Sequence, residues 1–229
     1  MQTVAASIMC ADQLDLNQEL RKLEAAGVEL LHCDVMDGVY VNNLAMGPYV
    51  LEQIKASTSI PLDIHLATVR PSKYIDMFAS IQPKYISFHV EASDDVERDI
   101  RKIKDYGIEP VIALNPESPI DLIKPYLSMV SMILMMTVNP GFAGQKFNYN
   151  VLEKIDELNH LFETLETRPL IEVDGNINQE TIPALVERGT NVYVLGTSSL
   201  FNQKEGTYLD KIQSVKELFL NRLEYGNQK

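Results

Sequence analysis

A chain of 229 residues with 45% hydrophobic residues can form one globular domain with a large core, and it leaves little room for a second domain. Its formal net charge of -12 argues against a nucleic-acid-binding surface, which normally needs clustered Lys and Arg. No apolar run reaches the roughly 18 residues of a membrane span, and the N-terminus enters a strand-like segment without a basic leader. We therefore expect a cytoplasmic protein without nucleic-acid or membrane partners, organised as one domain over residues 1–229.

Short segments rich in Val, Ile and Leu alternate with amphipathic segments along the chain, a pattern typical of repeated βα units. In chain order, strands are expected at 4–8, 30–35, 62–66, 85–90, 110–114, 132–138, 170–173 and 192–195. Helices are expected at 15–26, 48–57, 72–80, 94–106, 119–127, 151–165, 179–188 and 209–223. Eight such units predict a single (β/α)8 barrel.

Capping residues agree with these bounds. Asp94 and Asn178 offer N-cap side chains, and Ser118 precedes a proline at the first helical position. Glycines 27, 107 and 189 stand where helices end, at positions that favour left-handed backbone.

The two cysteines, Cys10 and Cys33, are too few for a disulfide framework and lack zinc-knuckle spacing. Free thiols of this kind usually fill apolar core positions. We expect both to be buried.

Polar residues that could carry chemistry stand near the ends of three predicted strands. Strand alternation points His32 and Asp34 to the same face of the second strand, His65 ends the third, and Asp174 follows the seventh. Two imidazoles and two carboxylates suit a divalent Zn, Mn, Fe or Co ion. Each residue alone could be a core histidine or a loop-capping aspartate. Four together at one end of a barrel favour a metal site, because unpaired buried charges are costly.

Glycine-rich turns follow the last three predicted strands, in residues 139–145, 174–176 and 196–198. Loops after the seventh and eighth strands of a barrel are the usual phosphate site, and glycine lets backbone amides approach an anion closely. Gly141 alone is better explained as a turn residue. Gly175 and Gly196 together favour a phosphate site.

Five strings of the sequence carry a resemblance to a known family. They are 7–12 (SIMCAD), 32–38 (HCDVMDG), 63–66 (DIHL), 136–145 (MTVNPGFAGQ) and 172–175 (EVDG). In this order they closely resemble the ribulose-phosphate 3-epimerase family over nearly the whole chain. The resemblance implies a homo-oligomeric isomerase that inverts C3 of a phosphorylated ketose, interconverting D-ribulose 5-phosphate and D-xylulose 5-phosphate in the pentose phosphate pathway.

The resemblance also assigns roles to residues. It implies one divalent ion, with Zn2+ as the first expectation and Fe2+, Mn2+ or Co2+ as alternatives, bound by His32, Asp34, His65 and Asp174. Asp34 and Asp174 are then the acid/base pair on opposite faces of the substrate, a cis-enediolate is the intermediate, and the ion stabilises its charge. The substrate-binding residues expected are Ser7, Met36, His65, Met136, Gly141, Gly144, Gly175, Asn176, Gly196 and Thr197.

Three assignments have a plainer alternative. Met36 and Met136 match methionines that line the pocket in the family, but methionines also fill cores. His89 ends the fourth strand and falls outside the matched metal set, so it is either pocket lining or core, with core favoured.

Two positions depart from the commonest pattern of the family and leave the length of the substrate open. Ala67 stands where methionine is usual, which would free volume beside His65, and Asn176 stands where a second glycine is usual. Asn176 and residues 196–202 look more like the branch that acts on D-allulose 6-phosphate and D-fructose 6-phosphate. That epimerase is the alternative, with a substrate one carbon longer.

Two other functions occur on related barrels or are compatible with this fold. Phosphosugar decarboxylases on related barrels need a lysine in an Asp-x-Lys-x-x-Asp arrangement, and the corresponding run from Asp34 to Asp37 lacks it. A non-catalytic sugar-phosphate-binding barrel is an alternative of another class, since a fold does not fix a function. The presence of both Asp34 and Asp174 favours the enzyme.

Overall fold

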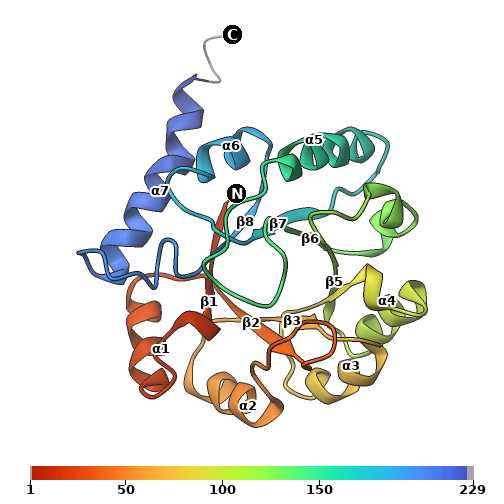
Figure 1. Cartoon of the computed structure of the whole chain (residues 1–229), viewed down its shortest axis with the longest axis horizontal. Helices are drawn as coiled ribbons and strands as arrows, with labels where there is room; N and C mark the ends of the chain where they lie inside the picture. The colour runs from red at the N-terminus through yellow and green to blue at the C-terminus, as the bar shows by residue number, and fades with distance from the viewer. Residues whose placement is uncertain (1, 226–229) are drawn as a thin grey trace.

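The computed structural model describes residues 2–225, with side chains as far as residue 220. Its parallel strands close into a barrel in chain order, and helices surround the barrel (Figure 1). The strands are β1 Thr3–Ser7, β2 Leu30–Met36, β3 Leu62–Ala67, β4 Tyr85–His89, β5 Glu109–Leu114, β6 Met132–Met136, β7 Leu170–Asp174 and β8 Val192–Leu195. The predicted (β/α)8 fold is confirmed.

The helices follow the predicted segments with one exception. They are α1 Leu16–Ala25, α2 Pro48–Ser57, α3 Ser72–Ala79, α4 Val96–Asp105, α5 Asn150–Phe162, α6 Ile182–Glu187 and α7 Tyr208–Tyr225, with short 3-10 turns η1 Ile8–Cys10 and η2 Val90–Ala92. The α-helix predicted at 119–127 is wrong, because two 3-10 helices, η3 Ile120–Leu122 and η4 Lys124–Met129, connect β5 to β6. Pro125 removes an amide donor in the middle of that segment and favours short 3-10 pieces.

Smaller differences lie at the ends of elements. The cap of α4 is Asp95 rather than Asp94, and its side chain accepts a hydrogen bond from the Arg98 amide. Strands β4 and β6 stop before Val90 and Val138, because the chain turns into the loops that form the rim of the barrel. Glycines 27, 107 and 189 have φ of +74°, +73° and +74°, as predicted for helix ends.

Strand alternation divides the core into two parts. On β2, Leu31, Cys33 and Val35 face outward and join the large apolar cluster shared with the helices, whereas Leu30 belongs to a separate cluster inside the barrel. His32 and Asp34, between these outward residues, therefore point inward, as predicted. The register pairs Asp34 with His65 on β3, which sets the two side chains at the same height.

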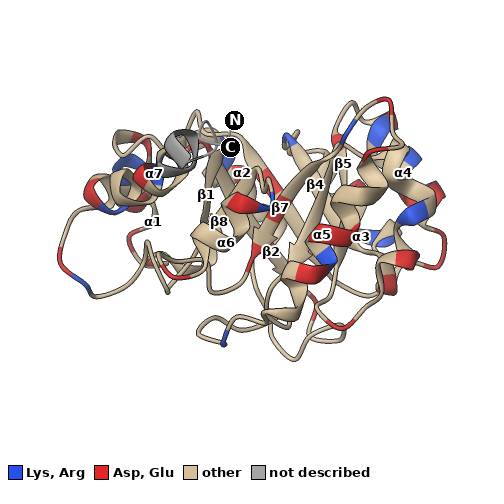
Figure 2. Ribbon diagram, turned by 90° about the horizontal axis from the view of Figure 1, so that it is seen from above, with Lys and Arg blue, Asp and Glu red and all other residues tan. Residues whose placement is uncertain are grey.

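The outer surface carries charges of both signs. Figure 2 shows basic residues interspersed with acidic ones on α4, α5 and α7. In residues 2–225, none of the helices combines the length and the apolar character that crossing a membrane requires.

Candidate active site

The four predicted metal ligands meet near the C-terminal ends of β2, β3 and β7. One ligand atom from each of His32, Asp34, His65 and Asp174 lies within 4.8 Å of the others. His65 Nδ1 is 3.0 Å from Asp34 Oδ1, while His32 Nε2 is 3.4 Å from that oxygen and 3.9 Å from Asp174 Oδ2. Among the described residues, buried His32 Nε2 has no hydrogen-bond partner of good geometry. The arrangement could hold a divalent ion with nitrogen and oxygen ligands.

Two more carboxylates lie behind His32, inside the barrel. Asp63 Oδ2 is 2.6 Å and Glu172 Oε1 is 3.6 Å from His32 Nδ1, and all three side chains are fully buried. A carboxylate can only accept, so Nδ1 donates to Asp63 and Nε2 is left for the pocket. Burial and neighbouring Asp63 raise the pKa of Glu172 well above its usual value. Neither Asp63 nor Glu172 was expected at the site from the sequence, although they share inward faces with His65 and Asp174.

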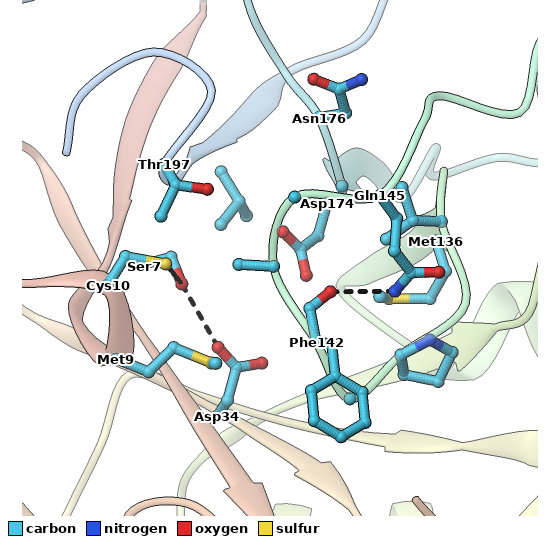
Figure 3. A pocket seen from close by; sticks show the side chains of 18 of the residues that line it. Ser7, Met9, Cys10, Asp34, Met136, Phe142, Gln145, Asp174, Asn176 and Thr197 are labelled. Atoms are coloured by element: carbon cyan, nitrogen blue, oxygen red, sulfur yellow. Dashed lines mark hydrogen bonds between the residues drawn. The ribbon is translucent and has the colours of Figure 1, made fainter. Parts of the chain in front are cut away.

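The two aspartates project into one pocket from different walls of the barrel (Figure 3). Burial, helped by Asp34, raises the pKa of Asp174 to about 6. Burial also favours a raised pKa for Asp34. The neighbouring His32 and His65 outweigh burial, however, and hold the pKa of Asp34 well below its usual range. One carboxyl group therefore stays ionised while the other keeps its proton to higher pH, the complementary pair that acid–base chemistry requires.

Burial opposes charge on His32, yet Asp34 and Asp63 raise its pKa well above the usual value. Without a metal, the ring thus tends to carry a positive charge. Metal binding has to displace that proton, so the affinity of the site depends on pH.

All the substrate-binding residues named from the sequence lie on the wall of this pocket, namely Ser7, Met36, His65, Met136, Gly141, Gly144, Gly175, Asn176, Gly196 and Thr197. The hydroxyl of Ser7, at the end of β1, donates a hydrogen bond to Asp34 Oδ2 at 3.3 Å. This bond helps to orient the Asp34 carboxylate. The β6–α5 loop and the turns after β7 and β8 form the rest of the wall.

Gly175 is required by the backbone at this point. Its φ is +121°, and an added Cβ would lie 2.5 Å from Val138 Cγ2 and 2.8 Å from the Val138 amide nitrogen. Asn176 follows with φ of +53°, and its Oδ1 accepts a hydrogen bond from Asn178 Nδ2 at 2.9 Å. The Asn176 side chain is therefore already engaged within the turn.

The expectation that Ala67 frees pocket volume is wrong. Ala67 is fully buried and is not part of the pocket wall. It packs in a small cluster with Met36 and Val41, against which Met9 and Tyr40 also lie. Alanine at this position therefore adds no space to the pocket wall.

The pocket also contains residues that the sequence analysis did not select. Met9 and Cys10 enter from η1, and Phe142 and Gln145 from the β6–α5 loop. Gln145 Nε2 donates to the Phe142 carbonyl at 2.9 Å and thereby closes that loop on itself. All four residues lie within the strings 7–12 and 136–145 that resemble the family, and this position was the signal by which the sequence could have indicated them.

The expectation of buried thiols is correct for Cys33 and wrong for Cys10. Cys33 faces outward from β2 into the core. The η1 turn carries half-buried Cys10 across the rim of the barrel, with its Sγ 3.6 Å from Ser7 Oγ.

His89 is fully buried and stands behind His65, away from the pocket wall. The Nε2 atoms of the two rings are 2.9 Å apart. The preference for a core position is confirmed, but this contact ties His89 to a predicted ligand.

Residues 3–201 match the Ribulose-phosphate 3 epimerase family. The chain is 39% identical over 203 residues to the ribulose-phosphate 3-epimerase of Bacillus subtilis, covering 88% of this chain and 93% of that one. It is 38% identical over 214 residues to the enzyme of the same name from Helicobacter pylori, covering 93% and 98%. Among solved structures, 3-hexulose-6-phosphate synthase from Salmonella typhimurium superposes with a TM-score of 0.68, 13% identity and coverage of 96% and 99%, which shows a shared fold.

Proposed function

Because the chain belongs to the ribulose-phosphate 3-epimerase family, we propose that it interconverts D-ribulose 5-phosphate and D-xylulose 5-phosphate by inverting C3 through a cis-enediolate. The enzyme is an isomerase of the epimerase type. The observation that carries the proposal is the pair Asp34 and Asp174, which enter one pocket from different walls with pKa values shifted in opposite directions.

The catalytic roles follow from these protonation states. Ionised Asp34 takes the C3 proton from one face of the substrate, and protonated Asp174 delivers a proton to the other face. In the reverse direction the two residues exchange roles. Two carboxyl groups are needed because one cannot reach both faces of the same carbon.

We assign His32, Asp34, His65 and Asp174 as ligands of one divalent ion, with Zn2+ proposed because imidazole and carboxylate ligands suit it. The chemistry that such an ion supplies is Lewis-acid stabilisation of negative charge on the substrate oxygens. Buried His32 Nε2, which faces both aspartates, supports this assignment.

The phosphate end of the substrate is assigned to the turns after β6, β7 and β8. Gly144, Gly175, Gly196 and Thr197 lie on the pocket wall there, and the crowding at Gly175 shows how closely the chain packs around that turn. Backbone amides in such turns can bind a phosphate despite the net charge of -12.

The pentulose phosphate is favoured over the hexulose phosphate for two reasons. The similar curated proteins are named ribulose-phosphate 3-epimerases. Burial of Ala67 also removes the added volume on which the longer substrate depended.

The proposal extends to a homo-oligomer in the cytoplasm, acting in the pentose phosphate pathway. Exposed apolar side chains Val39, Leu44 and Phe142 favour contact with a second copy, and the free thiols favour a reducing compartment.

The test compares metal-free and zinc-loaded protein on ribulose 5-phosphate and allulose 6-phosphate side by side. We expect zinc-dependent turnover with a higher kcat/KM for ribulose 5-phosphate. Full activity after exhaustive chelation, checked by elemental analysis, would reject the metal, and faster turnover of allulose 6-phosphate would reject the substrate.

A further inference from the structure

A chain of side chains runs outward from His65, away from the pocket. On the pocket side, His65 Nδ1 is 3.0 Å from Asp34 Oδ1. On the far side, His65 Nε2 is 2.9 Å from His89 Nε2. Beyond that, His89 Nδ1 is 3.5 Å from Oε2 of Glu91, whose side chain is 18% exposed. His89 is expected from the sequence to be core or pocket lining, and it has no part in the proposed catalysis.

The short contact between the two rings restricts where protons can sit. Two imidazole nitrogens 2.9 Å apart need one donor and one acceptor. If His89 donates, a neutral His89 presents a bare Nδ1 to the Glu91 carboxylate, which is repulsive. If His65 donates from Nε2, His89 carries its proton on Nδ1, towards Glu91.

Electrostatics favours the second arrangement. The Glu91 carboxylate lies on the Nδ1 side of the fully buried His89 ring, which places the His89 proton on Nδ1 and leaves Nε2 as the acceptor. Although burial opposes it, neighbouring His89 and Ser118 lower the pKa of Glu91 to about 2, so this side chain is a carboxylate. At 3.5 Å, Glu91 is too far from His89 Nδ1 for a short hydrogen bond. The negative charge of the carboxylate instead attracts the dipole of the Nδ1–H group.

We propose that His89 and Glu91 are positioning residues: when a metal is bound they hold the His65 proton on Nε2, so that Nδ1, which donates to Asp34 Oδ1 in the absence of a metal, presents its lone pair to the metal site. The inference rests on the proposed function, because it assumes that His65 is a ligand. His89 and Glu91 would then do for His65 what Asp63 does for His32, which is to accept the proton of the ring nitrogen that faces away from the metal site.

Neighbouring residues hold this chain in place. The Tyr40 ring lies against His89, with centroids 4.9 Å apart, and its hydroxyl accepts from Asn115 Nδ2 at 2.7 Å. The backbone amide of Asn115 donates to Glu91 Oε1 at 2.8 Å. Asn115 therefore bonds both to the tyrosine whose ring lies against His89 and to the carboxylate that faces His89. If packing alone explained His89, an aromatic ring of similar size would replace it without loss.

The first experiment measures Zn2+ affinity of the metal-free protein by chelator competition. We expect His89→Phe, which keeps a ring but has no acceptor, to weaken binding by about 10- to 100-fold, and His89→Gln, which restores an acceptor, to recover part of the loss. Glu91→Gln should weaken binding by about 10-fold. The control is Glu117→Gln, because exposed Glu117 bonds to Asn148 and not to His89.

The outcomes separate the two proposals. Absence of Zn2+ binding by the wild type would reject the metal site and this inference with it. Wild-type binding together with unchanged affinity in folded His89→Phe or Glu91→Gln would overturn the inference alone. So would equal losses in Glu91→Gln and Glu117→Gln.

A second experiment needs no variant. Long-range 1H–15N correlation spectra of the zinc-loaded protein identify which nitrogen of each histidine is protonated. We expect the proton on Nδ1 of His89 and on Nε2 of His65. A proton on Nε2 of His89 would overturn the inference.

Discussion

His32 donates its Nδ1–H to Asp63 Oδ2 at 2.6 Å, and both side chains are fully buried. This bond fixes the ring so that Nε2 faces Asp34 and Asp174. Loss of such a partner typically lowers metal affinity about 10- to 100-fold. We expect Asp63→Asn to weaken Zn2+ binding within that range, measured by chelator competition.

A matched control for Asp63→Asn is Asp99→Asn, which changes a buried carboxylate that bonds to Ser93 on the outer layer. This variant should keep wild-type affinity. Equal affinity of folded Asp63→Asn and wild type would contradict the role given to Asp63.

Asp34→Asn and Asp174→Asn should each nearly abolish epimerisation, because each removes a proton carrier and a ligand together. General acid–base groups are typically worth roughly 100- to 10,000-fold in rate. The measurement is kcat at saturating metal. Retention of more than about a tenth of wild-type turnover with metal bound would contradict the two-carboxylate mechanism.

The stability of the metal-free protein should respond to pH through Asp174. Its pKa is about 6 when folded, against 3.8 as the usual value, so the folded state binds more protons between these values. The contribution of this group to stability therefore falls as pH rises from about 4 to about 6. The pKa of His32 is also raised. Stability therefore falls further as pH rises above 6.5, the usual pKa of a histidine.

Metal binding has the opposite pH dependence, because the proton that His32 carries in the metal-free protein must leave. We expect the difference in Tm between zinc-loaded and metal-free protein to grow from about pH 5 to about pH 8, measured by calorimetry. A Tm difference independent of pH would contradict this linkage.

Gly175→Ala should impair both folding and substrate binding, because its Cβ would contact Val138 at 2.5 Å where φ is +121°. Gly107→Ala is the control, since Gly107 also has positive φ, at +73°, but an added Cβ meets nothing within 4 Å. Gly107→Ala should lower the free energy of unfolding by about 1 kcal/mol. A larger loss together with a raised KM is expected for Gly175→Ala, and equal effects would contradict the crowding argument.

Ala67→Met tests the assignment of the substrate. The added side chain must displace Met36 or Val41, and such overpacking typically costs about 1 to 3 kcal/mol of stability. Wild type should prefer ribulose 5-phosphate by kcat/KM. A wild-type preference for allulose 6-phosphate that Ala67→Met abolishes would restore the longer substrate.

The sequence by itself determined the barrel and the identity of the candidate ligands. Eight alternating βα segments dictate a closed parallel sheet, and period-two alternation fixes which side chains point inward. His32 and Asp34 could thus be placed on one inward face, and the C-terminal strand ends could be expected to converge. Their neighbours in sequence carried enough of a resemblance to indicate the chemistry.

Tertiary structure alone decided which inward residues touch. The contact of His32 with Asp63, and that of His65 with His89, depend on the register between strands, which composition and periodicity do not specify. Ala67 shows the same limit, because it is buried in a cluster with Val41, which comes from a loop that no local pattern places there. The pKa values of Asp34 and Asp174 diverge for the same reason: burial acts on both, but only Asp34 has a histidine within 3.0 Å.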